Sequence, residues 1–382
     1  MGVFCELVEN GAKPIALSHP MPPEELDASW SDFLRIAGAY GVELYREDAF
    51  PETRLFPSAL TSGKSLLVIY REPDRLIQYQ QWRADVRGRG SGEAFSDREL
   101  ARRLGRLLGY SPEGINRLLR ANSDYRDLAS AGITRQVTHL YYANPGEAVA
   151  FYSDVLGLER ADSTRFRISS DTYLEVHPPD ASHPVGLPKS TAIALLTDQL
   201  PDWYAHLQQQ HVPIKYTYKP RDGGPHDGFV AVDPGGYLLE FELFKQHPEN
   251  ERLMAVLNPA GAVPTKIDSL GFYGSITWTY HRGLLGMQRY YEEVFGFSLV
   301  ADQGWTKIFR TSGSGFIGLV DERRGMLDYA DSKAVEIEWG LSDIDAFDSH
   351  ARKSWTQYGY RDRRWTGPEN YRYQIDGTLS ER

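Results

Sequence analysis

The chain has 382 residues, of which 41% are hydrophobic, 12% aromatic and 25% charged. These fractions are near globular averages and exclude a disordered, collagen-like or coiled-coil protein, and the length predicts two or three domains. A net charge of −10 opposes nucleic-acid binding, and a single cysteine, Cys5, excludes an intrachain disulfide and any zinc or iron–sulfur site built from several cysteines.

An α/β region of unknown family and role is predicted over residues 1–131. The apolar run at 65–70 is typical of a buried strand, and Ser96 has Glu99 three residues later, the spacing of a helix N-cap. Strands are expected at 15–18, 42–45 and 65–70, and helices within 22–41 and at 74–86, 96–108 and 112–120.

The last two of these helices contain several arginines and are separated by a Gly-Tyr-Ser turn, as in a DNA-binding helix-turn-helix. One hypothesis is therefore a ligand-sensing regulator that uses residues 96–120. The acidic chain, together with Asp97, Glu99 and Glu113 among the arginines, favours an amphipathic pair that packs on the sheet. We expect no nucleic-acid partner.

Strand and helix patterns then recur in a fixed order from residue 134 to residue 244. Two β-α-β-β-type units in tandem are predicted, and because neither can bury its sheet face alone, they should curve around a shared cleft. Strands are expected at 137–142, 166–168, 172–176, 192–196, 214–218, 228–232 and 238–244, and helices at 146–156 and 201–210.

The pattern starts again near residue 275, where YYEEVFGF repeats the aromatic pair and the apolar-Gly-apolar ending of FYSDVLGLE. Strands near 308, at 316–320 and at 335–339, a helix at 344–358 and strand pieces to 375 follow. Several prolines lie between the copies, where a short helix is expected at 252–257. We divide the chain into residues 1–131, a domain at 132–245, a linker at 246–270 and a second domain at 271–382.

These repeats resemble the vicinal oxygen chelate superfamily, which includes glyoxalase I, extradiol dioxygenases and bleomycin-binding proteins. The resemblance rests on FYSDVLGLE, TAIALLTDQL, DPGGYLLEF, YYEEVFGF and FIGLVDERRG and covers about two thirds of the chain. It implies an α+β fold in which tandem βαβββ modules form two glyoxalase-like domains after the N-terminal α/β region.

Members with a metal place ligands at four equivalent strand positions on the inner face of the sheet. By this resemblance, the middle domain offers His139, Glu175 and Glu240, while the fourth position falls on Ala192. One imidazole and two carboxylates suit a divalent transition metal, namely Fe, Mn, Ni or Zn. His177 follows Glu175 on the same strand face and could replace the missing histidine, giving the two-histidine, one-carboxylate set of extradiol-type oxygenases.

Each of these residues also has an ordinary structural role open to it. A buried Glu240 needs a cation, and Arg135, Arg165 or Arg167 could supply one without any metal. Tyr141 and Tyr173 are expected to face the substrate or else to pack in the core. His226, in a glycine-rich loop, and Glu240 are the candidate catalytic acid/base residues.

The last domain is expected to be a degenerate, supporting copy, because Trp278 and either Gly318 or Leu319 replace the ligands and the final strand looks incomplete, with Glu381 as its remnant. The resemblance favours a metal-dependent isomerase, lyase or dioxygenase acting on a small oxygen-rich substrate in the middle cleft. The alternative is a metal-free protein that binds or sequesters a small molecule, such as a drug.

No stretch of the sequence is apolar enough for a signal peptide or a membrane span, so a cytoplasmic protein without membrane contact is expected. A small molecule is its expected partner, and a homodimer is left open.

Overall fold

The computed structural model describes residues 1–88, 97–122 and 124–377, which fall into two compact units, Met1–Arg126 and Asp127–Arg382. Among these residues, no helix combines the length and apolar character needed to cross a membrane.

The first unit contains a three-stranded antiparallel sheet with its longest apolar run, β3, in the middle. All residues of β3 are buried, as its continuous apolar sequence predicts. The strands are β1 (Ile15–Leu17), β2 (Glu43–Glu47) and β3 (Leu66–Tyr70), and the helices are α1 (Gly2–Glu9), α2 (Pro23–Ala39), α3 (Pro73–Arg87), α4 (Asp97–Leu107) and α5 (Pro112–Ala121). The helix pair expected at 96–120 is present as α4 and α5, while Ser96 lies outside the described residues.

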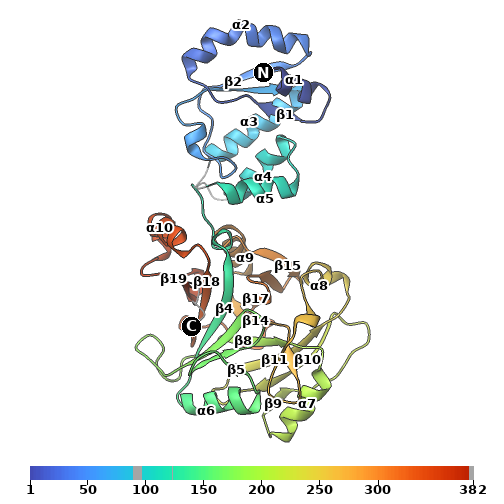
Figure 1. Cartoon of the computed structure of the whole chain (residues 1–382), viewed down its shortest axis with the longest axis vertical. Helices are drawn as coiled ribbons and strands as arrows, with labels where there is room; N and C mark the ends of the chain where they lie inside the picture. Colours follow the sequence, from blue (N-terminus) through green and yellow to red (C-terminus); the bar gives the residue numbers. More distant parts are fainter. Residues whose placement is uncertain (89–96, 123, 378–382) are drawn as a thin grey trace. The chain divides into compact units, whose positions relative to one another are not determined.

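The second unit is built from three βαβββ modules and a fourth, shorter βαββ module, which confirms the predicted α+β fold (Figure 1). The first contains β4 (Ile133–Tyr141), α6 (Pro145–Ala150) continued by a wider turn at Phe151–Val155, β5 (Glu159–Arg160), β6 (Arg165–Arg167) and β7 (Thr172–His177). The second contains β8 (Thr191–Leu196), α7 (Leu200–Gln209), β9 (Ile214–Tyr216), β10 (His226–Val232) and β11 (Leu238–Phe244).

The third module contains β14 (Gly274–His281), α9 (Leu284–Glu293), β15 (Ser298–Asp302), β16 (Thr306–Arg310) and β17 (Gly315–Asp321). The fourth contains β18 (Val335–Leu341), α10 (Ile344–Ser354), β19 (Arg364–Thr366) and β20 (Arg372–Gly377). Between the second and third modules lie α8 (Glu251–Met254), β12 (Val263–Pro264) and β13 (Gly271–Phe272).

The modules do not pair in chain order. The first and fourth share a seven-stranded sheet, β19-β20-β18-β4-β7-β6-β5, which we call the D sheet. The third and second share an eight-stranded sheet, β15-β16-β17-β14-β8-β11-β10-β9, which we call the E sheet (Figure 1). The two joints are antiparallel, β4 with β18 and β8 with β14.

This pairing corrects the expectation that residues 132–245 and residues 271–382 each close a cleft of their own. Every module leaves the edge of its first strand open, and the backbone groups of any other first strand can pair with that edge, so the sequence of one module alone does not specify its partner. The final strand, expected to be incomplete, is present as β20 and pairs in parallel with β18. Glu381 lies outside the described residues.

The motifs shared by the modules have structural roles. Gly157 and Gly296, the glycines of the apolar-Gly-apolar endings, both have positive φ, 63° and 73°, where glycine avoids the strain that a Cβ brings. Asp233 of the DPGG motif is buried and accepts hydrogen bonds from the hydroxyls of Tyr142 at 2.6 Å and Tyr152 at 2.8 Å. These contacts join α6 to the end of β10 and hold the helix on the sheet.

Candidate metal centre

The polar cluster of the D sheet is placed by strand register. In β7 buried and partly exposed residues alternate, so that Tyr173, Glu175 and His177 share the face opposite to the core. The parallel pairing of β4 with β7 sets His139 beside Glu175 and Tyr141 beside His177. One histidine of β4 and the Glu-x-His pair of β7 therefore lie next to one another on the same face of the sheet.

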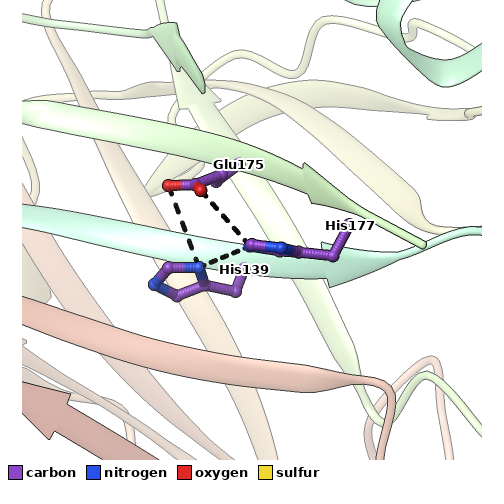
Figure 2. Close-up of side chains that lie close together, drawn as sticks. All are labelled: His139, Glu175 and His177. Atoms are coloured by element: carbon purple, nitrogen blue, oxygen red, sulfur yellow. Dashed lines mark hydrogen bonds and ion pairs between the residues drawn. The ribbon is translucent and has the colours of Figure 1, made fainter. Parts of the chain in front are cut away.

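The side chains of His139, Glu175 and His177 point toward one another (Figure 2). His139 Nδ1 lies 2.8 Å from His177 Nε2. The Glu175 carboxylate completes the triangle, with Oε1 3.6 Å from His177 Nε2 and Oε2 4.0 Å from His139 Nδ1. One ligand atom from each of the three side chains lies within 4.8 Å of the other two, which is close enough for all three to bind one metal ion. Within the described residues, these three form the group of His, Cys, Asp or Glu side chains that could do so.

The donor set fits a divalent transition metal. Neighbouring nitrogen or oxygen ligands at about 2.1 Å from an ion lie about 3 Å apart, which the three observed separations approach. Two imidazoles and one carboxylate form the set found in non-haem Fe(II) oxygenases. Burial, followed by the charge of His139, lowers the pKa of His177, so its ring is neutral at pH 7, the form that binds metals.

Arginines and a second carboxylate surround this triad. Arg165 donates from Nε to Glu175 Oε2 at 2.6 Å, which leaves Oε1 facing His177. Glu338 of β18 lies 3.5 Å from His139 Nε2 and 3.3 Å from the buried guanidinium of Arg135. Burial alone would raise the pKa of Glu338, but the contact with His139 and the charges of His139, Arg165 and Arg135 lower it to about 2.

Gln374 of β20 lies beside His139. Its Nε2 donates to Glu338 at 2.7 Å and lies 3.1 Å from His139 Nε2. A proton on His139 Nδ1 faces His177, and a proton on Nε2 faces Glu338. Metal binding at Nδ1 requires the proton to be on Nε2, where the carboxylate of Glu338 is placed to accept it.

Tyr141 supports the second histidine. Its ring stacks on His177 with centroids 5.3 Å apart and on His183 with centroids 3.7 Å apart. Burial, then the charges of Glu336 and Asp180, raises the pKa of Tyr141, so its hydroxyl stays protonated at neutral pH and can donate but not act as a base. Tyr173 shares the face of Glu175 and His177 on β7.

The structure separates the other predicted site residues from this cluster. Glu240 lies in β11 and His226 in β10, both in the E sheet, where they line a different cavity. The prediction that Glu240 shares a metal with His139 is wrong, because the two strands belong to different sheets. Ala192 pairs with Trp278 in the E sheet, so it is not the fourth position around His139.

Two residues beside His139 were not predicted, Glu338 and Gln374. The register places them in neighbouring strands, Glu338 opposite Gln374, through the parallel pairing of β18 with β20. The alternating pattern of VEIEW and RYQID marks both as strands with polar residues on one face. What the sequence lacks is any signal that the fourth module joins the first.

One family model matches part of the second unit. Residues 134–241 match the family model described as "Glyoxalase/Bleomycin resistance protein/Dioxygenase superfamily". No curated protein matches the chain.

Three of the similar solved structures are described by their sequence identity, their TM-score and the share of each chain that the match covers. Glyoxalase I from Zea mays has 10% identity and a TM-score of 0.43, covering 64% of this chain and 91% of that one. A putative dioxygenase from Bacillus subtilis subsp. subtilis str. 168 has 18% identity and a TM-score of 0.44, covering 66% and 86%. Lactoylglutathione lyase from Agrobacterium tumefaciens has 21% identity and a TM-score of 0.24, covering 28% and 96%.

Proposed function

We propose, from the premise that residues 134–241 belong to the glyoxalase/bleomycin resistance/dioxygenase superfamily, that the D sheet carries the active site of a metal-dependent enzyme. His139 Nδ1, His177 Nε2 and Glu175 Oε1 would hold the ion. The substrate would be a small organic molecule with two neighbouring oxygens. The observation that carries the proposal is the convergence of these three side chains on one face.

A bound divalent ion would polarise the substrate oxygens as a Lewis acid, and Fe(II) would also supply the redox chemistry of an oxygenase. The protein side chains would do the rest. Arg165 holds Glu175 in place, and its guanidinium adds positive charge that favours an anionic substrate oxygen. Glu338 and Gln374 orient His139, and Tyr141 keeps His177 in position by stacking and offers a protonated hydroxyl.

Among dioxygenase, lyase and isomerase chemistry, the donor set and the charges support the dioxygenase. Proton abstraction from a substrate needs a base with a pKa near the working pH. Glu338, with a pKa of about 2, is too weak a base for this role, and Glu175 is engaged by Arg165. Two histidines with one carboxylate suit Fe(II) best, with Mn(II), Ni(II) and Zn(II) as the other ions that this set can hold.

The test is a chelator-buffered titration of the metal-free protein with Fe(II) under anaerobic conditions, and with Mn(II), Ni(II) and Zn(II). We expect one equivalent to bind, and His139→Ala and His177→Ala each to weaken binding at least tenfold. His211→Asn is the matched control, because His211 is exposed and its φ of 55° is tolerated by asparagine. Equal affinity in all four proteins would contradict the proposal.

A second candidate function rests on the same contacts. The hydrogen bonds from Gln374 through His139 to His177, with Arg165 on Glu175, form a network that is closed without an ion. This favours a metal-free protein that binds or sequesters a small molecule, such as a drug. If the titration finds no metal affinity, this second function becomes the better account.

A further inference from the structure

The E sheet carries a second cleft, with a cavity of about 280 Å³ that has no part in the proposed metal centre. Seven of the nineteen lining residues within the described part of the chain are phenylalanine, tyrosine or tryptophan. The aromatic lining residues that matter here are Tyr216, Phe229, Phe244, Trp278, Tyr280 and Trp305. Into this apolar setting β11 places two carboxylates, Glu240 and Glu242, two residues apart and therefore on one face of the strand.

The two sheets can be compared position by position, because their strand registers correspond. In the D sheet, Glu338 pairs with Gln374, and two residues later comes Asp376. In the E sheet, Ala194 pairs with Glu240, and two residues later comes Glu242. Glu242 is therefore the counterpart of Asp376.

In the D sheet the carboxylates have arginine partners. Arg135 lies 2.9 Å from Asp376, and Arg165 lies 2.6 Å from Glu175. The corresponding positions of the E sheet hold Gly274, opposite Leu196, and Ile308, opposite Gly318. Of the D-sheet carboxylates, the E sheet thus keeps only the one at the Asp376 position, as Glu242. It gains a carboxylate, Glu240, at the position of Gln374, and it lacks both arginines.

The described residues supply no substitute. Glu242 is 6% exposed, and its Oε2 is buried without a hydrogen-bond partner among them. Neither Glu240 nor Glu242 forms an ion pair within the part of the chain that the structure describes. Arg324 is the one lysine or arginine among the described lining residues, and it is exposed, with its guanidinium 5.0 Å from the centroid of the Trp305 ring.

These carboxyls are poised to respond to a cation. Burial raises the pKa of Glu240 to about 8, and burial followed by the charge of Glu240 raises the pKa of Glu242 well above its usual range. Both therefore tend to hold protons while the cavity has no cation. A positive group that enters the cavity would favour the ionised carboxylate and release a proton to the solvent.

We propose that this cavity binds a small organic cation, a protonated amine or quaternary ammonium on an aromatic or aliphatic body. The buried carboxylate of Glu242 and the partly buried one of Glu240 attract the charge. The faces of aromatic rings such as Trp278, Trp305 and Tyr280 suit both a cation and an apolar body. A volume of 280 Å³ corresponds to about nine liquid water molecules and limits the ligand to roughly ten non-hydrogen atoms. A metal ion suits the cavity less well, because no third ligand joins the two glutamates within the described residues.

The test compares three probes of similar size and different charge: 2-phenylethylammonium, 2-phenylethanol and phenylacetate. Each is titrated calorimetrically into the unaltered chain at pH 7 with EDTA present, so that no metal contributes. We expect the ammonium compound to bind at least tenfold more tightly than the alcohol, and the carboxylate not to bind measurably. Equal affinity for the ammonium and the alcohol would overturn the proposal.

Variants locate the site. Glu242→Gln and Glu240→Gln keep the side-chain volume, and each should reduce the preference for the ammonium probe over the alcohol at least fivefold. Asp222→Asn is the control and should not change this preference, because Asp222 is exposed and lies outside the cavity lining. His139→Ala, which disables the proposed metal centre, should leave ammonium binding unchanged. Loss of binding in His139→Ala, or unchanged preference in the Glu240→Gln/Glu242→Gln double variant, would overturn the assignment to this cavity.

Discussion

Replacing Glu338 by glutamine tests the electrostatics of the D sheet, because it removes one charge and keeps the volume of the side chain. Glu338 and Arg135 are both nearly buried, with side chains 6% exposed, and lie 3.3 Å apart. The ordinary pKa of a glutamate, 4.5, falls to about 2 at this position. At about 1.4 kcal/mol per pKa unit, this difference corresponds to about 3 kcal/mol of stability at neutral pH.

The pH dependence of this contribution has a definite sign. Because the folded pKa lies below the unfolded one, the stabilisation is complete above pH 4.5 and is lost as the pH falls toward 2. Glu338→Gln should therefore cost about 3 kcal/mol at pH 7 and progressively less below pH 4.5. Urea unfolding followed by tryptophan fluorescence measures this cost, with Trp339 in the same strand as a reporter.

Glu159→Gln is the matched control. Glu159 also faces an arginine, with Arg167 at 3.5 Å, but its side chain is 61% exposed. Its loss should change stability by no more than about 0.5 kcal/mol at any pH. The reasoning is refuted if Glu338→Gln costs as little as this control, or if its cost is the same at pH 3.5 and pH 7.

Three further predictions concern both sheets. Glu240→Gln should raise the melting temperature, measured by differential scanning calorimetry, more at pH 8 than at pH 5. The folded-state pKa of Glu240 is about 8, so ionisation of the wild-type carboxyl opposes folding as the pH rises above 4.5. Equal increases at both pH values would contradict this prediction. Gly318→Ala places a Cβ against the Trp278 ring. It should lower the free energy of unfolding in urea by about 1–3 kcal/mol and weaken binding of 2-phenylethylammonium. An unchanged urea midpoint would show that the ring moves freely. Gln374→Glu supplies a second acceptor for a proton on His139 Nε2, so it should tighten Mn(II) binding about tenfold in a chelator-buffered titration. Unchanged Mn(II) affinity would contradict this prediction.

The sequence carried enough information to predict the modules and part of the site. The repeated aromatic pair with its glycine ending marked the helices, and the alternation in TYLEVH placed Glu175 and His177 on one face. The spacing from His139 to that strand is local to one module, so the resemblance was sufficient to bring these residues together. His177, two residues after Glu175, was predicted only as a possible substitute for the missing histidine, and its role as a ligand stays a prediction.

The partner of each module was not predictable in the same way. Backbone hydrogen bonds between β4 and β18 carry no sequence code, and both β8 and β18 offer backbone groups that could pair with the edge of β4. Glu240 was therefore assigned to the wrong cleft, and Glu338 and Gln374 were not assigned at all. The contrast between the polar D sheet and the apolar E sheet, which motivates the cation proposal, appears only when the pairing is known.

The central claim, that His139, His177 and Glu175 hold a metal ion, is tested most directly by anomalous diffraction. Crystals of the protein grown with Mn(II) or anaerobic Fe(II) should show one strong anomalous peak at the metal edge. We predict that this peak lies within bonding distance of His139 Nδ1, His177 Nε2 and Glu175 Oε1. The absence of a peak at this place in metal-loaded crystals, or a peak at Glu240 and Glu242 instead, would contradict the account.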